Sequence, residues 1–243
     1  MKRSLFFILT CFTCVCKSQT GFDVESGVAM FGYNDVRIPG NTATQFSISD
    51  DLNSSPTPFI RARVKYTLGK RHTISALYAP LSIKSNGTLQ QDLDFQNKTF
   101  TAGTPLKVSW KFNSYRLSYT YAFILRERFS LAAGLTGKVR DAKIAVSNSD
   151  VTAEKTNVGV VPLVRLYMDW NFCPRFNLIL DGDALVGKQG RAEDVFTGLG
   201  YTAAKNLTIK AGYRLLEGGA DNNEVYNFSS VHYAVIGVMF MIQ

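Results

Sequence analysis

Long apolar runs, histidine, proline and cysteine are scarce in this sequence, and these scarcities exclude several classes of protein. Beyond a short N-terminal run, no window approaches the roughly 18 apolar residues of a transmembrane helix. Proline occurs seven times and glycine 19 times in 243 residues, too seldom for a collagen or a disordered chain. The Gly-x-Ser-x-Gly, His-Glu-x-x-His and phosphate-loop motifs are missing. With 46% hydrophobic and 19% charged residues, the composition is that of an ordered chain.

The amino-terminal segment has the pattern of a secretory signal peptide. Lys2 and Arg3 precede an apolar run over residues 5–15, which is too short to cross a bilayer. The sequence therefore predicts a cleaved signal peptide at residues 1–18 and a single domain at residues 19–243. One alternative is an uncleaved membrane anchor, and another is a lipoprotein acylated on one of three early cysteines. None of these cysteines follows the small Gly, Ala or Ser that acylation favours. These cysteines are Cys11, Cys14 and Cys16.

Removal of residues 1–18 changes the cysteine and charge counts. Three of the four cysteines leave with this segment, and Cys173 alone remains. Because one cysteine cannot form an internal disulfide, the exported domain must be held together without cross-links. Of the 27 basic residues 24 remain, against 19 acidic ones, a net charge of +5. That balance in an exported chain does not argue for nucleic acid, and we expect no nucleic-acid partner.

The rest of the chain alternates apolar and polar residues with a period of two, which is typical of β-strands. Between residues 60 and 68 the even-numbered positions are apolar, whereas Arg61, Arg63 and Lys65 lie between them. The same alternation recurs over residues 115–125 and 207–215. Ten strands are predicted in this way, at 22–34, 58–68, 72–83, 107–125, 129–146, 156–172, 175–187, 192–203, 206–216 and 225–242.

The lengths of these strands and of their connections predict a membrane barrel. Most strands are long enough to cross a bilayer at a tilt, which takes about 9–11 residues. Tight links alternate with longer polar loops at 35–57, 84–106, 147–155 and 217–224. We therefore expect an all-β fold, a closed antiparallel transmembrane β-barrel of about ten strands (8–12) with short periplasmic turns and longer extracellular loops.

Aromatic residues gather near the strand ends, where the two membrane interfaces of such a barrel would lie. The pairs are Trp110 with Phe112, Trp170 with Phe172, and Tyr226 with Phe228. A soluble, lipocalin-like ligand-binding barrel is the alternative, with its apolar faces inward and its charges in water. The signal peptide, the aromatic bands and a count of about ten strands, where lipocalins have eight, favour the membrane barrel.

In a membrane barrel the charged strand faces line the lumen, and counting outward from tight turns predicts which charges meet. One turn places Arg165 near Asp181 and Asp183, so that none of the three is buried alone. Another turn places Arg116 opposite Lys138, a repulsive pair unless a third group supplies negative charge.

Glu25 in the first strand is predicted to pair with Lys65 or Arg63. Eight cations and four carboxylates are expected in the lumen. An interlocked network of salt bridges would give a narrow, rigid barrel with a structural or binding role, whereas the excess positive charge would suit a narrow anion-preferring pore. The predicted luminal charges are Glu25, Arg61, Arg63, Lys65, Arg116, Lys138, Arg165, Asp169, Asp181, Asp183, Lys210 and Arg214.

The best catalytic candidates are Ser230 and His232, which share one face of the last strand near the predicted outer rim. This pair would suit a lipid hydrolase or acyltransferase. A serine two residues from a histidine is common by chance, so the sequence argues against an enzyme more than for one.

The acidic loop near the C-terminus offers oxygen ligands for calcium at Glu217, Asp221 and Glu224. Its spacing is not that of an EF-hand, and its glycines and asparagines are ordinary turn formers. We expect no metal and no cofactor.

The run from Gly212 to Asp221, continued by Glu224 to Phe228, resembles one found in small uncharacterised members of the outer-membrane β-barrel superfamily of Gram-negative bacteria. The resemblance implies an outer-membrane location, contact with outer-membrane lipid and insertion by the barrel-assembly machinery. It implies no chemistry and leaves the oligomeric state open. Such barrels usually end in an aromatic residue, whereas here Phe240 is the last aromatic residue before the terminal Gln243.

Overall fold

The computed structural model describes residues 18–187 and 190–242. All but the last residue of the predicted signal peptide therefore lies outside the described residues, together with the three cysteines considered for acylation. The described residues form an all-β molecule. Among them there is no helix of the length and apolar character needed to span a bilayer.

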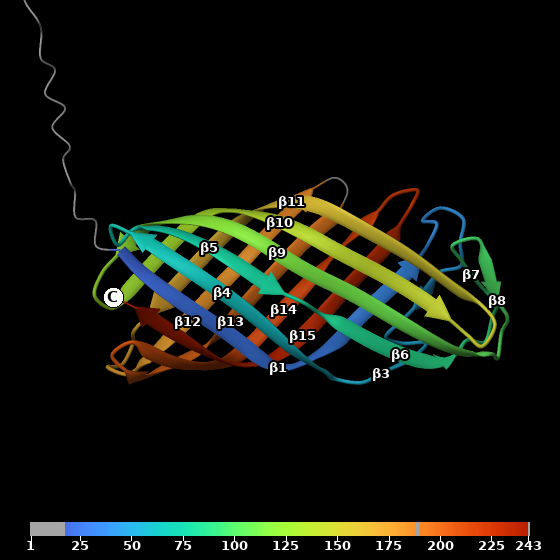
Figure 1. Cartoon of the computed structure of the whole chain (residues 1–243), viewed down its shortest axis with the longest axis horizontal. Coiled ribbons are helices and arrows are strands. Elements are labelled where there is room, and N and C mark those ends of the chain that lie inside the picture. Colours follow the sequence, from blue (N-terminus) through green and yellow to red (C-terminus); the bar gives the residue numbers. More distant parts are fainter. Residues whose placement is uncertain (1–17, 188–189, 243) are drawn as a thin grey trace, which may run out of the picture.

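Ten antiparallel strand positions close into a barrel, as the sequence predicts (Figure 1). Neighbours follow the order β1-β4-β5-β9-β10-β11-β12-β13-β14-β15, and β15 pairs back along β1 from Ile242 to Tyr226. β5 and β6 both pair with β9 and share one position in the wall, while the short β2 and β3 pair with β1 and β6. The strands are β1 (Ser18–Arg37), β2 (Phe46–Ser47), β3 (Asn53–Ser54), β4 (Thr57–Leu68), β5 (His72–Ala79), β6 (Ser82–Thr88), β7 (Leu93–Phe95), β8 (Lys98–Phe100), β9 (Pro105–Leu125), β10 (Phe129–Ser147), β11 (Thr152–Trp170), β12 (Phe176–Gly187), β13 (Gly190–Ala204), β14 (Leu207–Asp221) and β15 (Tyr226–Ile242).

The two ends of the barrel differ in their connections. Four short turns and the C-terminus lie at one end, which we call the turn end (Figure 1). The opposite loop end carries residues 38–56 and residues 89–104, the second of which contains the β7–β8 hairpin. The amide of Gln96 in this hairpin donates to the carbonyl of Ile38 at 3.0 Å, which joins the two segments.

Two of the predicted loops are mostly strand. β10 and β11 meet across residues 148–151 only, and β14 runs on to Asp221, so the expected loops 147–155 and 217–224 are wrong in extent. The reason is that the strands continue beyond the apolar belt with polar outward residues. Lys111 and Asp141, for example, form an outward ion pair of 2.8 Å on β9 and β10. Polar residues at the end of a strand resemble a loop in the sequence, so these strands were predicted too short.

The outer wall carries a belt of exposed apolar side chains. Leu135, Val160 and Ile236 are 68%, 76% and 65% exposed. Tyr78 stacks on Tyr115 at the loop-end side of the belt, with ring centroids 5.2 Å apart. Charged residues of the same strands point inward and are buried. A lipocalin-like barrel would turn its apolar faces inward, so the alternative of a soluble, lipocalin-like barrel is wrong.

Inside, the loop end of the barrel is filled by an apolar core and the middle by charge. Phe95, Phe100 and Trp110 are almost fully buried in this core. Trp110 and Phe112 were expected in an outer aromatic band, but they share their strand face with the buried Arg116 and point inward. The period-two alternation of β9, which decides the face, overrides their nearness to a strand end.

Candidate functional site inside the barrel

A buried cluster of charged side chains fills the middle of the lumen. It comprises seven cations and five carboxylates that are linked by ion pairs and come from seven of the ten strand positions. Each strand contributes through alternation, because its outward neighbours face the apolar belt. We call this set the charge cluster: Asp23, Glu25, Arg61, Arg63, Lys65, Arg116, Arg165, Asp181, Asp183, Asp194, Lys210 and Arg214.

Asp194 on β13 is the centre of one half of the charge cluster. Its carboxylate receives Arg61 at 2.9 Å and Arg214 at 2.5 Å, and it also receives Arg116. Arg116 reaches on to Asp183 at 2.7 Å. Each of these side chains is at most 5% exposed. Three guanidinium groups from β4, β9 and β14 thus converge on one carboxylate across the lumen, which ties opposite walls together.

Arg165 on β11 binds the two carboxylates that sequence counting assigned to it. Its guanidinium lies 2.6 Å from Asp181 and 3.1 Å from Asp183. The Thr136 hydroxyl also donates to Asp183 at 2.7 Å. Arg116 lies opposite Lys138, as counting predicts, and the negative charge that this repulsive pair needs is supplied to Arg116 only. Asp183 and Asp194 bind Arg116, and neither of them binds Lys138.

The pairing predicted for Glu25 is wrong by two residues. Glu25 lies opposite Arg61 in the β1–β4 register, and it binds Arg61 at 3.3 Å and Arg214 at 2.8 Å. Lys65 instead binds Asp23 at 3.3 Å, and Asp23 also binds Lys210 at 2.6 Å.

Sequence reasoning missed two acids of the charge cluster, Asp23 and Asp194. Asp23 alternates with Glu25, so the period of two was a sufficient signal for it. Asp194 shares its face with Phe196 and glycines, and nothing in that pattern marks the face as polar. With both acids and the inward Arg140 included, the predicted eight cations over four acids become nine over six. Asp169 lies outside the charge cluster and accepts from Asn177 at 2.9 Å.

Two inward cations lie just beyond the charge cluster toward the loop end. Lys138 is 3% exposed, and its ammonium lies 4.7 Å from the centre of the Phe112 ring. Arg140, two residues along β10, donates to the side-chain oxygen of Asn157, and its Nε is buried without a partner. Among the residues that the structure describes, no carboxylate lies within 4.0 Å of either cation. Burying a charge without an opposite charge is costly.

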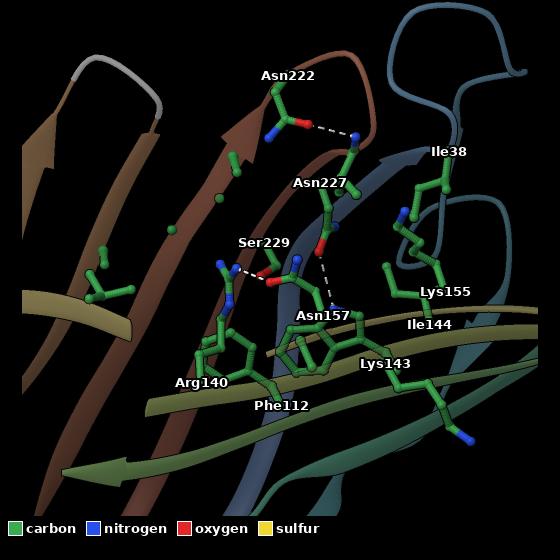
Figure 2. Close-up of a pocket in the computed structure, with 18 of the residues that line it drawn as sticks. Ile38, Phe112, Arg140, Lys143, Ile144, Lys155, Asn157, Asn222, Asn227 and Ser229 are labelled. Atoms are coloured by element: carbon green, nitrogen blue, oxygen red, sulfur yellow. Dashed lines mark hydrogen bonds between the residues drawn. The ribbon is translucent and has the colours of Figure 1, made fainter. Parts of the chain in front are cut away.

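These two cations line a cavity of about 520 Å³ at the loop-end side of the charge cluster. Figure 2 shows Phe112, Arg140 and Asn157 pointing toward one another across it, whereas Lys143 points away. Trp110, stacked on Phe112 with ring centroids 5.4 Å apart, lines the cavity with apolar surface. The cavity therefore combines an apolar side with unpaired positive charge.

The structure does not join the candidate dyad Ser230 and His232. Both lie near Gly32 of β1, but no hydrogen bond between them is present in the described structure, and the Nδ1 of His232 pairs with the Tyr213 hydroxyl.

The calcium candidates are also apart. Glu217 binds Arg191, Glu224 binds Lys155 at 3.2 Å, and Asp221 is exposed at the strand end. Within residues 18–187 and 190–242, no group of three acids, histidines or cysteines has the geometry of a metal site.

Comparison with solved structures identifies the fold. The outer membrane protease OmpT from Escherichia coli superimposes with a TM-score of 0.58 at 10% identity, over 92% of this chain and 97% of that one. Ail of Yersinia pestis in complex with sucrose octasulfate gives 0.42 at 10% identity, over 92% and 99% of the two chains. The translocator domain of the autotransporter NalP from Neisseria meningitidis gives 0.45 at 11% identity, over 92% and 88%.

At these identities the likeness to OmpT shows a shared fold and no shared chemistry, and the two weaker matches add no argument. The chain has the fold of outer-membrane β-barrel proteins, as its sequence predicts. No protein-family model matches the sequence, and no curated protein is significantly similar to it.

Proposed function

We propose that the protein is an integral barrel of the bacterial outer membrane whose lumen is closed by the charge cluster, and that it has a binding role and not a conducting one. In this proposal it is exported by a signal peptide at residues 1–18, inserted by the barrel-assembly machinery and surrounded by outer-membrane lipid. The exposed apolar belt supports the location, because such a surface is stable only against lipid.

One observation supports a closed lumen. Arg116 bridges Asp183 and Asp194. Arg61 and Arg214 bind the same Asp194 from other strands. An ion that crosses the lumen would have to separate these pairs. A barrel of about ten strands encloses little more space than its inward side chains need. The apolar core at the loop end is a second layer across the same path.

Conductance in a planar bilayer tests the closed lumen. The refolded wild-type protein is expected to give no steady conductance steps. Replacing Arg116 and Asp183 together by serine keeps the net charge and empties part of the charge cluster. In a background that also carries Phe95→Ser and Phe100→Ser, which thins the apolar core at the loop end, conductance should appear. The control removes a second ion pair in the same way, Lys111 with Asp141, which lies on the outer wall and should leave the bilayer silent.

Three results would overturn the proposal, each in favour of one alternative. A steady anion-selective conductance of the wild type would make it a narrow anion-preferring pore. Lipid processing that is lost in a His232→Ala protein would make it a rim-site lipid enzyme. A freely soluble protein whose gel band does not shift on boiling would place it outside the membrane.

A further inference from the structure

The inner cavity is walled on one side by an incompletely paired strand. β11 pairs with β10 along its whole length, from Thr152 to Trp170. On its other side it pairs with β12 only from Val164 to Trp170. Among the described strands, residues 152–163 therefore have no ladder partner toward β12. Figure 1 shows β10 and β11 running on toward the loop end while β12 and β13 stop short.

Part of this free edge lies at the level of the apolar belt. Val160 is opposite Val139 in the β10–β11 register, and Val139 belongs to the belt. Val158 and Val160 are 70% and 76% exposed, and Val186 at the end of β12 is 74% exposed. Pro162 lies two residues beyond the last β11–β12 pair, and proline within a strand is confined to sheet edges because it lacks an amide donor.

An unpaired edge facing lipid is not tolerated in the hydrocarbon region, whereas irregular backbone that lines a cavity is. The free edge of β11 meets the second condition, because Asn157 and Val161 of this edge line the cavity. The free edge of β11 therefore lies between the belt surface, at Val158 and Val160, and the cavity, at Asn157 and Val161.

The lining of the cavity indicates what enters. Its volume falls within the range of about 300–1,000 Å³ that small-molecule sites occupy. Trp110 and Phe112 offer an apolar surface for a hydrocarbon chain. Lys138 and Arg140 form no ion pair within the described residues, and the two glutamates that also line the cavity, Glu217 and Glu224, are paired with Arg191 and Lys155. A bound anion would remove the cost of burying the two cations.

We propose that the cavity binds a single-chain amphiphile with an anionic head, a carboxylate or a phosphate monoester, and that the chain enters from the membrane through the gap between β11 and β12. The head binds at Lys138 and Arg140, and the chain lies against Trp110 and Phe112. This inference rests on the proposed binding role and supplies its ligand class.

The two tryptophans of the chain allow a direct test. Trp170 lies at the turn end of the outer wall, 47% exposed, whereas Trp110 lines the cavity. In a Trp170→Phe protein refolded into phosphatidylcholine vesicles, Trp110 is the only reporter. Dibromostearate quenches tryptophan at close contact, so it should quench Trp110 with saturation. The brominated fatty alcohol should bind at least about tenfold more weakly, because a hydrogen bond to a charged group contributes about 1.5–3 kcal/mol.

Brominated lysophosphatidic acid in a parallel titration distinguishes the two head groups, and either of them supports the inference. An Arg140→Gln protein should lose about tenfold in affinity for the anionic probe, with little change for the alcohol. Equal quenching by acid and alcohol, or none by either, would overturn the inferred ligand class.

The route is tested by filling the gap. Val160 of β11 and Val186 of β12 lie beside the gap and face outward, so Val160→Phe combined with Val186→Phe should obstruct the gap from the belt side and abolish quenching without touching Arg140. Gly137→Phe is the matched control, because Gly137 lies on the fully paired β10 and faces outward; quenching should persist. Val158→Phe combined with Val186→Phe is a second obstructing variant in case the first does not fold.

Persistent quenching in folded, obstructed proteins would overturn the lateral route. The conductance experiment tests whether the charge cluster closes the lumen, and it does not test binding in the cavity. Failure of the closed lumen and failure of the cavity are therefore seen separately: a conducting protein whose Trp110 is quenched by the acid contradicts only the first.

Discussion

Replacement of Asp194 by asparagine should destabilise the barrel more than any surface change of the same kind. The substitution keeps the size of the side chain and removes its negative charge. Arg61, Arg116 and Arg214 then remain buried around a neutral amide, with only Glu25 and Asp183 left to pair with them. Removal of one partner from a buried ion pair costs about 3–5 kcal/mol, so we expect a loss of about that size.

Denaturant unfolding in lipid vesicles measures this loss. Folded and unfolded protein are separated by the gel shift on boiling and followed by tryptophan fluorescence, and the midpoint and slope give the free energy of unfolding. Glu193→Gln is the matched control, because Glu193 precedes Asp194 on the same strand, faces outward and forms no ion pair in the described structure. Its change should stay within about 0.5 kcal/mol.

A double-mutant cycle separates the ion pairs from general damage. Arg116→Gln alone should destabilise the protein, and combined with Asp194→Asn it should cost less than the two single changes together. If Asp194→Asn unfolds at the wild-type denaturant concentration, water in the lumen solvates the guanidinium groups, and the reasoning that treats the charge cluster as a dry, closed network is refuted.

Three further predictions concern topology, packing and pH. A membrane-impermeant maleimide should label Cys173 in the β11–β12 turn only after the outer membrane is permeabilised, whereas Ser149→Cys in a Cys173→Ser background should be labelled on intact cells; the reverse pattern would invert the barrel. Gly212→Ala should lower the unfolding free energy by about 1–3 kcal/mol, because its new carbon would lie 2.3 Å from a backbone oxygen of β13; an unchanged midpoint in denaturant would contradict this. The hydrogen bond from Lys111 holds the pKa of the outward Asp141 carboxyl below its ordinary value. The stabilising contribution of this pair is therefore present at neutral pH and is lost as the pH falls through the lowered pKa. An NMR titration that gives an ordinary pKa for Asp141 would contradict the pairing.

The accuracy of the sequence-based pairing follows the length of the connecting chain. Arg165 was assigned to Asp181 and Asp183 across a turn of a few residues, which fixes the register almost by itself. Glu25 was assigned two residues away from its partner Arg61, because the connection from β1 to β4 runs over residues 38–56 and does not set the register. The ten strands and most of their faces were predictable because the apolar belt imposes a period of two, whereas the faces of Trp110, Phe112 and Asp194 were not recognised.

The cavity was not predictable, because it depends on distances between strands that are far apart in the sequence. The alternation of β9 already places Trp110 and Phe112 on the luminal face, yet only closure of the barrel brings them beside Arg140. The free edge of β11 is likewise invisible in the sequence, except for Pro162, whose missing amide is compatible with an edge.

The charge cluster also constrains the order in which this barrel assembles. Asp23 and Glu25 belong to β1, the first strand of the barrel. Lys210 and Arg214, which bind them, belong to β14, the last strand but one. Until β1 meets β15, Lys210 has neither of its two acidic partners, and Glu25 and Arg214 lack their contact with each other. A half-built sheet would hold Lys210 unpaired in or beside the bilayer. Closure of the seam and neutralisation of the interior are therefore one event, so the barrel should form in a single cooperative step, and a chain without β1 should fail to insert and not form a nine-stranded sheet.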